Sequence, residues 1–120
     1  MDNRIIPIVQ SLHNSQFYFN TEKELQEGIS QVLSAKKIPF EREFKLGDSG
    51  TIDFLICGSI GLEVKTGGTW VGIIRQLMRY ASSDIITSII LISRKSVFSK
   101  VPNILRRKPV YVVDLWKSAL

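Results

Sequence analysis

Residues 51–66, TIDFLICGSIGLEVKT, decide the fold, because they predict a β-hairpin in the middle of the chain. Two apolar strands flank a turn with the sequence GSIG, and three charged residues interrupt the strands: Asp53, Glu63 and Lys65. Charged side chains are rarely buried without a partner, because the loss of hydration opposes their burial. We therefore expect these three groups to be paired with one another or to carry the function of the protein.

The length of the turn determines whether the three charges meet on one face of the hairpin. Glu63 and Lys65 are two residues apart, so their side chains leave the same face of a strand. A two-residue loop would place Asp53 opposite Val64 and on the other face, whereas a three-residue loop, residues 58–60, would pair Asp53 with Lys65. We therefore expect an odd-length turn or a bulge, which the glycines allow.

The remaining elements follow the order helix, three strands, helix, strand, strand. The first helix is predicted to begin at Thr21, where Thr21-x-x-Glu24 has the form of a capping box, and to run to about Lys37. The second helix is predicted over residues 70–83, with Ile73, Ile74, Leu77, Met78 and Ala81 on its apolar face, and the other strands over residues 40–46, 85–92 and 110–113. This order predicts an α/β domain with a mixed four- to five-stranded sheet flanked by helices.

Length and composition limit the classes of protein that the chain can belong to. A chain of 120 residues forms one domain, and its net charge of +5 suits a polyanionic partner. The single cysteine, Cys57, excludes an internal disulfide and a cysteine-rich zinc site. No stretch approaches the roughly 18 apolar residues of a membrane span, and no signal peptide begins the chain. We expect no membrane partner and an intracellular location, in the cytoplasm or nucleoid, or in a host cell if a virus or mobile element encodes the chain.

The charged trio has the composition that phosphodiester hydrolysis requires. A hard cation must neutralise the phosphate and lower the pKa of the attacking water, and carboxylates hold such a cation. Asp53 and Glu63 can supply the carboxylates, with the backbone carbonyl of Val64 as a further oxygen ligand. Lys65 would place an ammonium group beside the metal ion, where it can orient the water and offset charge on the transition state.

The spacing of the charged trio resembles the core motif of the PD-(D/E)XK nuclease superfamily. In this chain Asp53 is followed by nine residues and then by Glu63-Val64-Lys65 on an apolar strand. The resemblance covers residues 21 to about 93. It implies a restriction-endonuclease-like core and a DNA endonuclease that depends on Mg²⁺ or Mn²⁺. Ile52 stands where the namesake motif has proline, and the signature of the VRR-NUC branch is absent after the second helix.

Two further residues are similar to motif positions of this superfamily. Glu22, which projects toward the buried stripe of the first helix, resembles a glutamate that joins the metal site in the VRR-NUC and Holliday-junction-resolvase-like branches. Gln76 resembles a glutamine that many members place near the site. The resemblance thus implies the catalytic set Asp53, Glu63, Lys65, Glu22 and Gln76. It also suggests branched or junction DNA as the substrate and a homodimer as the assembly.

In this interpretation the chain is a single nuclease-like domain. Residues 21–93 form the catalytic core, and residues 94–120 form a C-terminal extension. For residues 1–20 the periodicity leaves two possibilities open, a short helix packed on the domain or an arm that contacts a second copy. Basic residues after the site could bind DNA phosphates, and we name Arg75, Arg79, Arg94 and Lys95 for this role, within a larger set that includes Lys100, Arg106, Arg107 and Lys108.

A structural alternative exists for each of these residues. Asp53, Glu63 and Lys65 could form a cross-strand salt bridge. Glu22 could merely favour the start of its helix, Glu24 fits the capping box, and Glu43 is a further acidic candidate for the site. The alternative function is a catalytically inactive nucleic-acid-binding or interaction module with the same fold.

Overall fold

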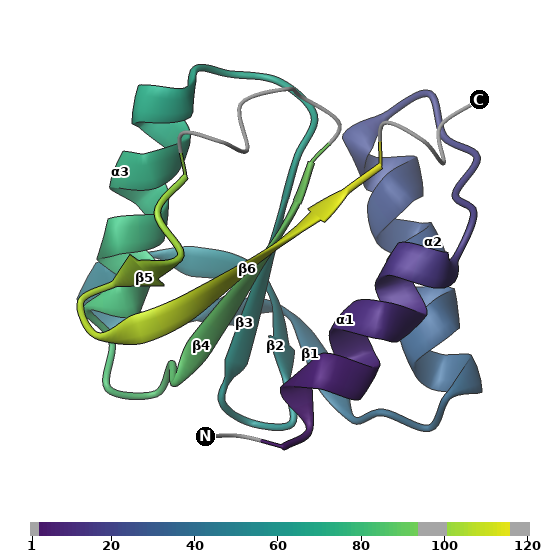
Figure 1. The fold of residues 1–120 in the computed structure, drawn as a ribbon, viewed down its shortest axis with the longest axis horizontal. Coiled ribbons are helices and arrows are strands. Elements are labelled where there is room, and N and C mark those ends of the chain that lie inside the picture. Colours follow the sequence, from purple (N-terminus) through teal and green to yellow (C-terminus); the bar gives the residue numbers. More distant parts are fainter. Residues whose placement is uncertain (1–2, 94–100, 116–120) are drawn as a thin grey trace.

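The computed structural model describes residues 3–93 and 101–115, in which helices cover a six-stranded mixed sheet (Figure 1). The predicted α/β class and mixed sheet are confirmed. The predicted strand number of four to five is wrong, because a two-residue strand, too short to recognise from sequence, pairs with the last one. The elements in chain order are α1 (Ile5–Asn14), α2 (Glu22–Ala35), β1 (Phe40–Lys45), the 3₁₀ turn η1 (Gly47–Ser49), β2 (Thr51–Ile56), β3 (Ile60–Lys65), α3 (Trp70–Ala81), β4 (Ser88–Ser93), β5 (Ile104–Leu105) and β6 (Lys108–Asp114).

The strands lie in the order β1-β2-β3-β4-β6-β5. Strands β1, β2 and β3 form an antiparallel meander, whereas β3, β4 and β6 run parallel to one another. The crossover between β3 and β4 contains α3, as a parallel connection requires. Every residue of β4 is buried, which explains the apolar run IILI between its two terminal serines. No helix in residues 3–93 and 101–115 combines the length and the apolar character that crossing a bilayer requires.

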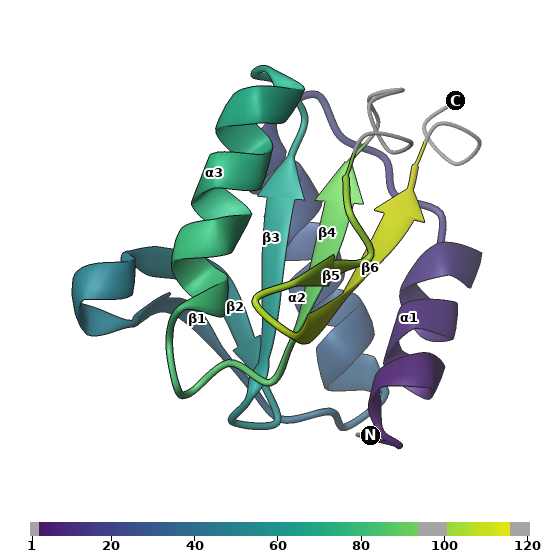
Figure 2. The ribbon, with the colours of Figure 1, turned by 60° about the vertical axis from the view of Figure 1, so that its left-hand side comes forward.

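The helices form two layers on opposite faces of the sheet (Figure 2). On one face, α1 and α2 pack on β2, β3, β4 and β6, with Leu25 and Ile29 of α2 among the fully buried residues. On the other face, α3 and the β5–β6 hairpin share a second apolar cluster, in which Leu77 and Leu105 are both buried. The sheet is therefore covered on both faces at its centre.

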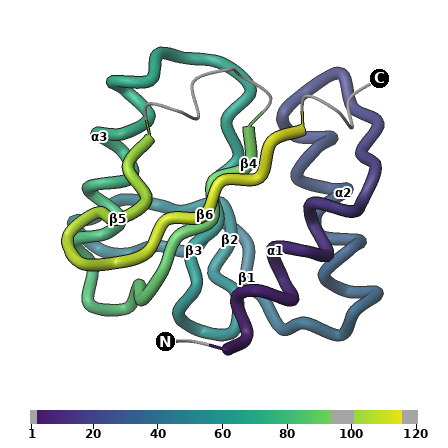
Figure 3. The backbone as a smooth tube through the Cα atoms, in the orientation of Figure 1, coloured from purple at the N-terminus to yellow at the C-terminus, as the bar shows by residue number. Residues whose placement is uncertain are grey.

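Helix α1 is the short packed helix that the sequence left as one of two possibilities. Its residues Ile5, Ile8 and Leu12 are buried, and the helix lies beside α2 and β6, so that the first helix and the last strand are neighbours (Figure 3). Pro7 falls in the first turn, where a backbone N–H has no partner within the helix, so its missing donor costs little.

Helix α2 begins as its sequence predicts and ends earlier. Thr21 Oγ1 accepts a hydrogen bond from the Glu24 N–H at 3.1 Å, and Glu24 Oε1 accepts one from the Thr21 N–H at 3.1 Å, which completes the capping box. The helix stops at Ala35, because Lys37 adopts a left-handed conformation with φ of 58°.

Helix α3 buries Ile73, Leu77 and Ala81 as predicted, but Tyr80 takes the place on the apolar face that was predicted for Met78. Met78 is 38% exposed, whereas Tyr80 is buried. Tyr80 follows Leu77 by three residues and Ile73 by seven, so it continues the buried stripe, whereas Met78 follows Ile73 by five and points away. The burial of a phenol on this stripe brings a hydroxyl group under α3, against the sheet.

Candidate active site

The β2–β3 hairpin has a three-residue loop, the length that lets its charged side chains share one face. Ile56 pairs with Ile60, which leaves Cys57, Gly58 and Ser59 in the loop. The predicted odd length is confirmed, but the loop begins one residue earlier than predicted. Cys57 and Gly58 both have positive φ angles, of 52° and 77°, and this conformation of a non-glycine residue could not be read from sequence.

Strands β2 and β3 open at Asp53, where side chains replace the backbone pairing. Regular pairing of the two strands extends from the loop to Phe54 and stops there. Beyond it, the Val64 N–H donates to Asp53 Oδ2 at 2.8 Å, and the Asp53 N–H donates to Glu63 Oε1 at 3.2 Å. Continuing the register would place Asp53 across from Glu63, so its predicted pairing with Lys65 is wrong.

A change of sides along β2 directs Asp53 toward β3. Ile52 belongs to the apolar cluster under α3, whereas Phe54 belongs to the cluster under α2. Residues two apart in a regular strand share a face, so the strand must twist sharply at Asp53. The neighbouring strand β1 has its own irregularity at Glu43, which has a φ of 49° and lies in the gap of the β1–β2 register. Glu43 is exposed and makes none of the contacts of the opening.

Glu63 and Lys65 share the face that α3 covers, as their spacing predicts. The Glu63 side chain is nearly inaccessible, with the residue 2% exposed, and its Oε2 lies 3.5 Å from Lys65 Nζ. Lys65 is partly exposed at the end of β3. The ammonium group therefore stands between the buried carboxylate and the solvent.

Tyr80 completes the surroundings of Glu63. Its hydroxyl lies 2.7 Å from Gln76 Nε2, 2.9 Å from the Thr51 carbonyl oxygen and 3.1 Å from Glu63 Oε2. A phenol has one hydrogen, so it can donate to only one of the two oxygens. When Glu63 is protonated, it can donate to the phenol oxygen while Tyr80 donates to Thr51, and every group is then satisfied.

Burial dominates the acid–base properties of this cluster. Burial, followed by the charge of Asp53, raises the pKa of Glu63 to about 8, and Lys65 only partly opposes this shift. Burial also raises the pKa of Asp53, although its hydrogen bond from the Val64 amide acts in the opposite direction. The pKa of Tyr80 is raised by burial and by the neighbouring Glu63, so Tyr80 stays a neutral phenol. Two carboxyl groups thus compete for ionisation in one opening.

Glu22 lies at the rim of the opening, on the α2 side. Its Oε2 accepts hydrogen bonds from the Thr66 N–H at 3.3 Å and from Thr66 Oγ1 at 3.1 Å, and these bonds attach the start of α2 to the end of β3. After burial, the charge of Glu22 contributes to the raised pKa of Asp53, which places its carboxylate within electrostatic reach of the opening. Glu24 is exposed, and its carboxylate accepts the capping-box hydrogen bond from the Thr21 N–H.

The carboxylates fit a magnesium-like ion that keeps most of its water. In the described ranges, 3–93 and 101–115, no three His, Cys, Asp or Glu side chains converge on a position that could hold a metal ion. Mg²⁺ typically binds to one or two carboxylates and completes its octahedron with water and substrate phosphate oxygens. Asp53 and Glu63, with the carbonyl of Val64 directly after Glu63, match that requirement, whereas the described residues form no closed protein cage.

The sequence missed two residues of the site. Tyr80 and Thr66 hold Glu63 and Glu22, respectively, through side-chain hydroxyls. Tyr80 follows Gln76 by one helical turn. This spacing places both side chains on one side of α3, and it is the signal in the sequence that indicates a Gln–Tyr pair. Gln76, which the resemblance places near the site, donates a hydrogen bond to the Tyr80 hydroxyl.

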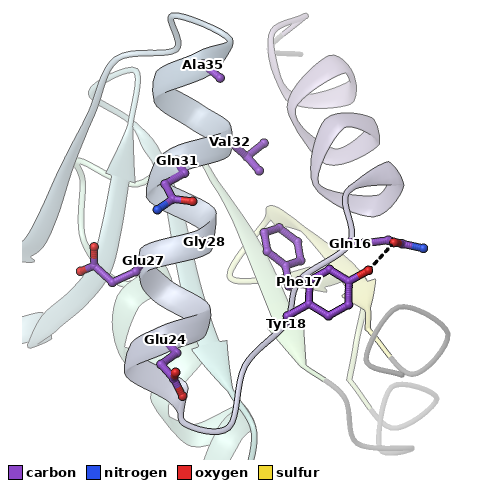
Figure 4. Close-up of a pocket in the computed structure, with 9 residues that line it drawn as sticks. All are labelled: Gln16, Phe17, Tyr18, Glu24, Glu27, Gly28, Gln31, Val32 and Ala35. Carbon is purple, nitrogen blue, oxygen red and sulfur yellow. Dashed lines mark hydrogen bonds between the residues drawn. The ribbon is translucent and has the colours of Figure 1, made fainter.

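The predicted DNA-binding residues fall in two groups. Arg75 and Arg79 are exposed on α3. Arg94 and Lys95, with Lys100, lie outside the described residues. Elsewhere, a pocket of about 540 Å³ between the α1–α2 connection and the outer face of α2 contains none of the predicted catalytic residues (Figure 4). Its lining includes Tyr18 and Glu27, and this pocket thus lies apart from the charged opening.

Comparisons with known proteins identify no relative of the chain. The chain matches no protein-family model, no curated protein and no solved structure. The resemblance to PD-(D/E)XK nucleases therefore stays a prediction from the motif residues of the sequence.

Proposed function

We propose that the protein is a metal-dependent DNA endonuclease that hydrolyses phosphodiester bonds. One observation carries the proposal: the opening between β2 and β3 brings together Asp53, Glu63 and the Lys65 ammonium group. The Lys65 Nζ lies 3.5 Å from Glu63 Oε2, and Asp53 is linked to Glu63 through its own backbone N–H. A purely structural ion pair needs one carboxylate, whereas the second carboxylate, the partly buried Asp53, raises the free energy of the metal-free protein.

Asp53 and Glu63 would hold Mg²⁺ or Mn²⁺, with the Val64 carbonyl as a further oxygen and Glu22 at the rim. When bound, the ion neutralises the phosphate and makes the water more acidic. Lys65 would orient that water and stabilise the negative charge that develops on the phosphoryl oxygens. Hydrolysis forms a bond from the water oxygen to phosphorus and breaks the bond to the leaving oxygen, which gains a proton.

Gln76 and Tyr80 would position Glu63 rather than touch the substrate. The hydrogen-bond chain from Gln76 through the phenol to Glu63 fixes one carboxylate oxygen, and the Asp53 N–H fixes the other. Both oxygens are therefore oriented before a ligand enters. Such orientation by a surrounding shell of residues supports metal affinity and activity.

The second candidate is a nucleic-acid-binding or interaction module without catalysis. The lack of a three-ligand group within the described residues favours it, because a metal site assembled in advance would contain more protein ligands. The two candidates predict different responses to metal ions. A nuclease requires Mg²⁺ or Mn²⁺ for its reaction, whereas a binding module holds DNA equally well in EDTA.

A cleavage assay tests the proposal. Labelled linear, branched and single-stranded DNA is incubated with the protein in Mn²⁺, beside an EDTA control and the Lys65→Ala variant. Lys45→Ala is the matched control, because Lys45 is exposed on β1 and makes none of the contacts of the opening. We expect cleavage that EDTA and Lys65→Ala abolish and Lys45→Ala retains, with branched or junction DNA preferred. DNA binding without cleavage would instead support the second candidate.

A further inference from the structure

The turn between β5 and β6 contains two arginines in a conformation that arginine rarely adopts. Leu105 pairs with Lys108, so the loop consists of Arg106 and Arg107 alone. Their φ angles are 49° and 69°, as in a type I′ turn. Such turns favour Asn-Gly or Asp-Gly, because a side chain with a Cβ atom is strained in the left-handed region. The sequence therefore departs from the residues that would fold best here.

No hydrogen bond or ion pair to residues 3–93 and 101–115 explains the two arginines. Both are exposed, and neither guanidinium makes a hydrogen bond or ion pair with the residues that the structure describes. The next residue, Lys108, does have a structural role, because its Nζ donates to the Ser83 carbonyl oxygen just after α3. The two arginines break the sequence preference of the turn without a stabilising contact from the described residues in return, and such departures are typical of functional positions.

The arginine turn lies on the same face of the sheet as Glu63, at the other end of the strands. The β5–β6 hairpin packs on this face beside α3 (Figure 2), where Leu105 joins the apolar cluster under α3 and Tyr80 of α3 contacts Glu63. Lys65 is level with the end of β6, whereas the turn precedes the start of β6. Helix α3 adds the exposed Arg75 and Arg79 to the same side. A set of arginines on one side of a domain gives that side a positive potential, which attracts a polyanion.

We propose that the Arg106–Arg107 turn binds the phosphate backbone of duplex DNA, an inference that rests on the proposed nuclease function and names its DNA-contacting element. The guanidinium group presents a fixed fork of donors that matches phosphate oxygens. A two-residue turn anchored by Lys108 holds both groups at the end of a short hairpin. The strain of the turn is the consequence of keeping two charges there.

The decisive variant is Arg106→Asn/Arg107→Gly, which installs the preferred turn while removing both charges. We expect it to raise the melting temperature by about 2–8 °C, because the strain is relieved. In the same variant, affinity for a labelled duplex should fall about tenfold or more, since charge-assisted contacts are lost. The slope of log K against log salt should decrease by about 2, one for each phosphate contact. Fluorescence anisotropy in EDTA measures binding without cleavage.

The matched control is Lys36→Asn/Lys37→Gly, at the end of α2. It removes the same number of charges, and Lys37 also has a positive φ, of 58°. Both lysines are exposed, and α2 covers the opposite face of the sheet. We expect this variant to keep at least half of the wild-type affinity. A loss equal to that of the arginine variant would overturn the proposal, because it would show a general effect of net charge.

The outcomes separate this inference from the proposed function. If the wild type cuts DNA and the arginine variant binds duplex unchanged, the inference fails and the nuclease stands. If the wild type neither cuts nor binds DNA, both fail. A variant that loses affinity for poly-glutamate but keeps it for duplex would assign the turn to an acidic protein surface, and would also overturn the proposal.

Discussion

Replacing Glu63 with glutamine should stabilise the metal-free protein, and the effect should depend on pH. Burial and the Asp53 charge raise the pKa of Glu63 to about 8, from 4.5 when the group is unperturbed. The folded protein thus holds a proton that the unfolded chain has released. The contribution of Glu63 to stability is fully present below pH 4.5 and is lost as pH rises to about 8.

The size of the effect follows from the same shift. Each pH unit between the two pKa values costs about 1.4 kcal/mol, so the loss at pH 7 is about 3 kcal/mol at most. Glutamine resembles the protonated acid, since its amide can donate to Tyr80 Oη while its oxygen accepts from the Asp53 N–H. Glu63→Gln should therefore remove this loss, by an amount that increases from pH 5 to pH 8.

The assay is urea unfolding in EDTA at a series of pH values from 4.5 to 8.5, with circular dichroism as the signal. Glu41→Gln is the matched control, because Glu41 is exposed on β1 and its loss removes the same formal charge. The variant and wild type should have similar stability near pH 5 and diverge above it. Equal stability differences at pH 5 and pH 8 would refute the raised pKa and the competition between the two carboxyls.

Three further predictions follow from the same contacts. Tyr80→Phe removes the hydroxyl that orients Glu63, so we expect kcat to fall about 10- to 100-fold with little change in KM in steady-state assays, and an unchanged kcat would exclude a positioning role. Gly61→Ala should lower the unfolding free energy in urea by about 1–3 kcal/mol, because the added Cβ would meet Ile52 Cδ1 and Ile86 Cδ1, and a neutral effect would show that β2 can move. We expect a dimer by light scattering, since one small domain offers little surface to hold DNA, and a monomeric mass at working concentration would remove this expectation.

Local patterns in the sequence predicted the elements that depend on local rules. The capping box at Thr21 predicted the start of α2, and the apolar runs on either side of the GSIG turn predicted two paired strands. The odd length of the loop was predicted from the requirement that the three charged side chains share one face of the hairpin. Its position shifted by one residue, since the left-handed conformation of Cys57 depends on the folded hairpin.

Features that depend on distant residues could not be predicted in the same way. Strand β5 forms because Ile104 and Leu105 pair with β6 and because Leu105 packs on the apolar surface under α3. The twist of β2 at Asp53 breaks the period-two pattern on which strand prediction rests. Tyr80 joins Glu63 through the packing of α3 on the sheet, which spacing alone does not specify.

The measurement that tests the central claim most directly is Mn²⁺ binding by calorimetry, to the wild type and to Asp53→Asn, at pH 7.5. If Asp53 and Glu63 form a metal site, the wild type should bind Mn²⁺ saturably and release protons to the buffer, because ligand carboxyls must ionise. Asp53→Asn should lose most of that affinity. Equal Mn²⁺ affinity in the two proteins would contradict the account, and would leave the buried charges as a structural ion pair.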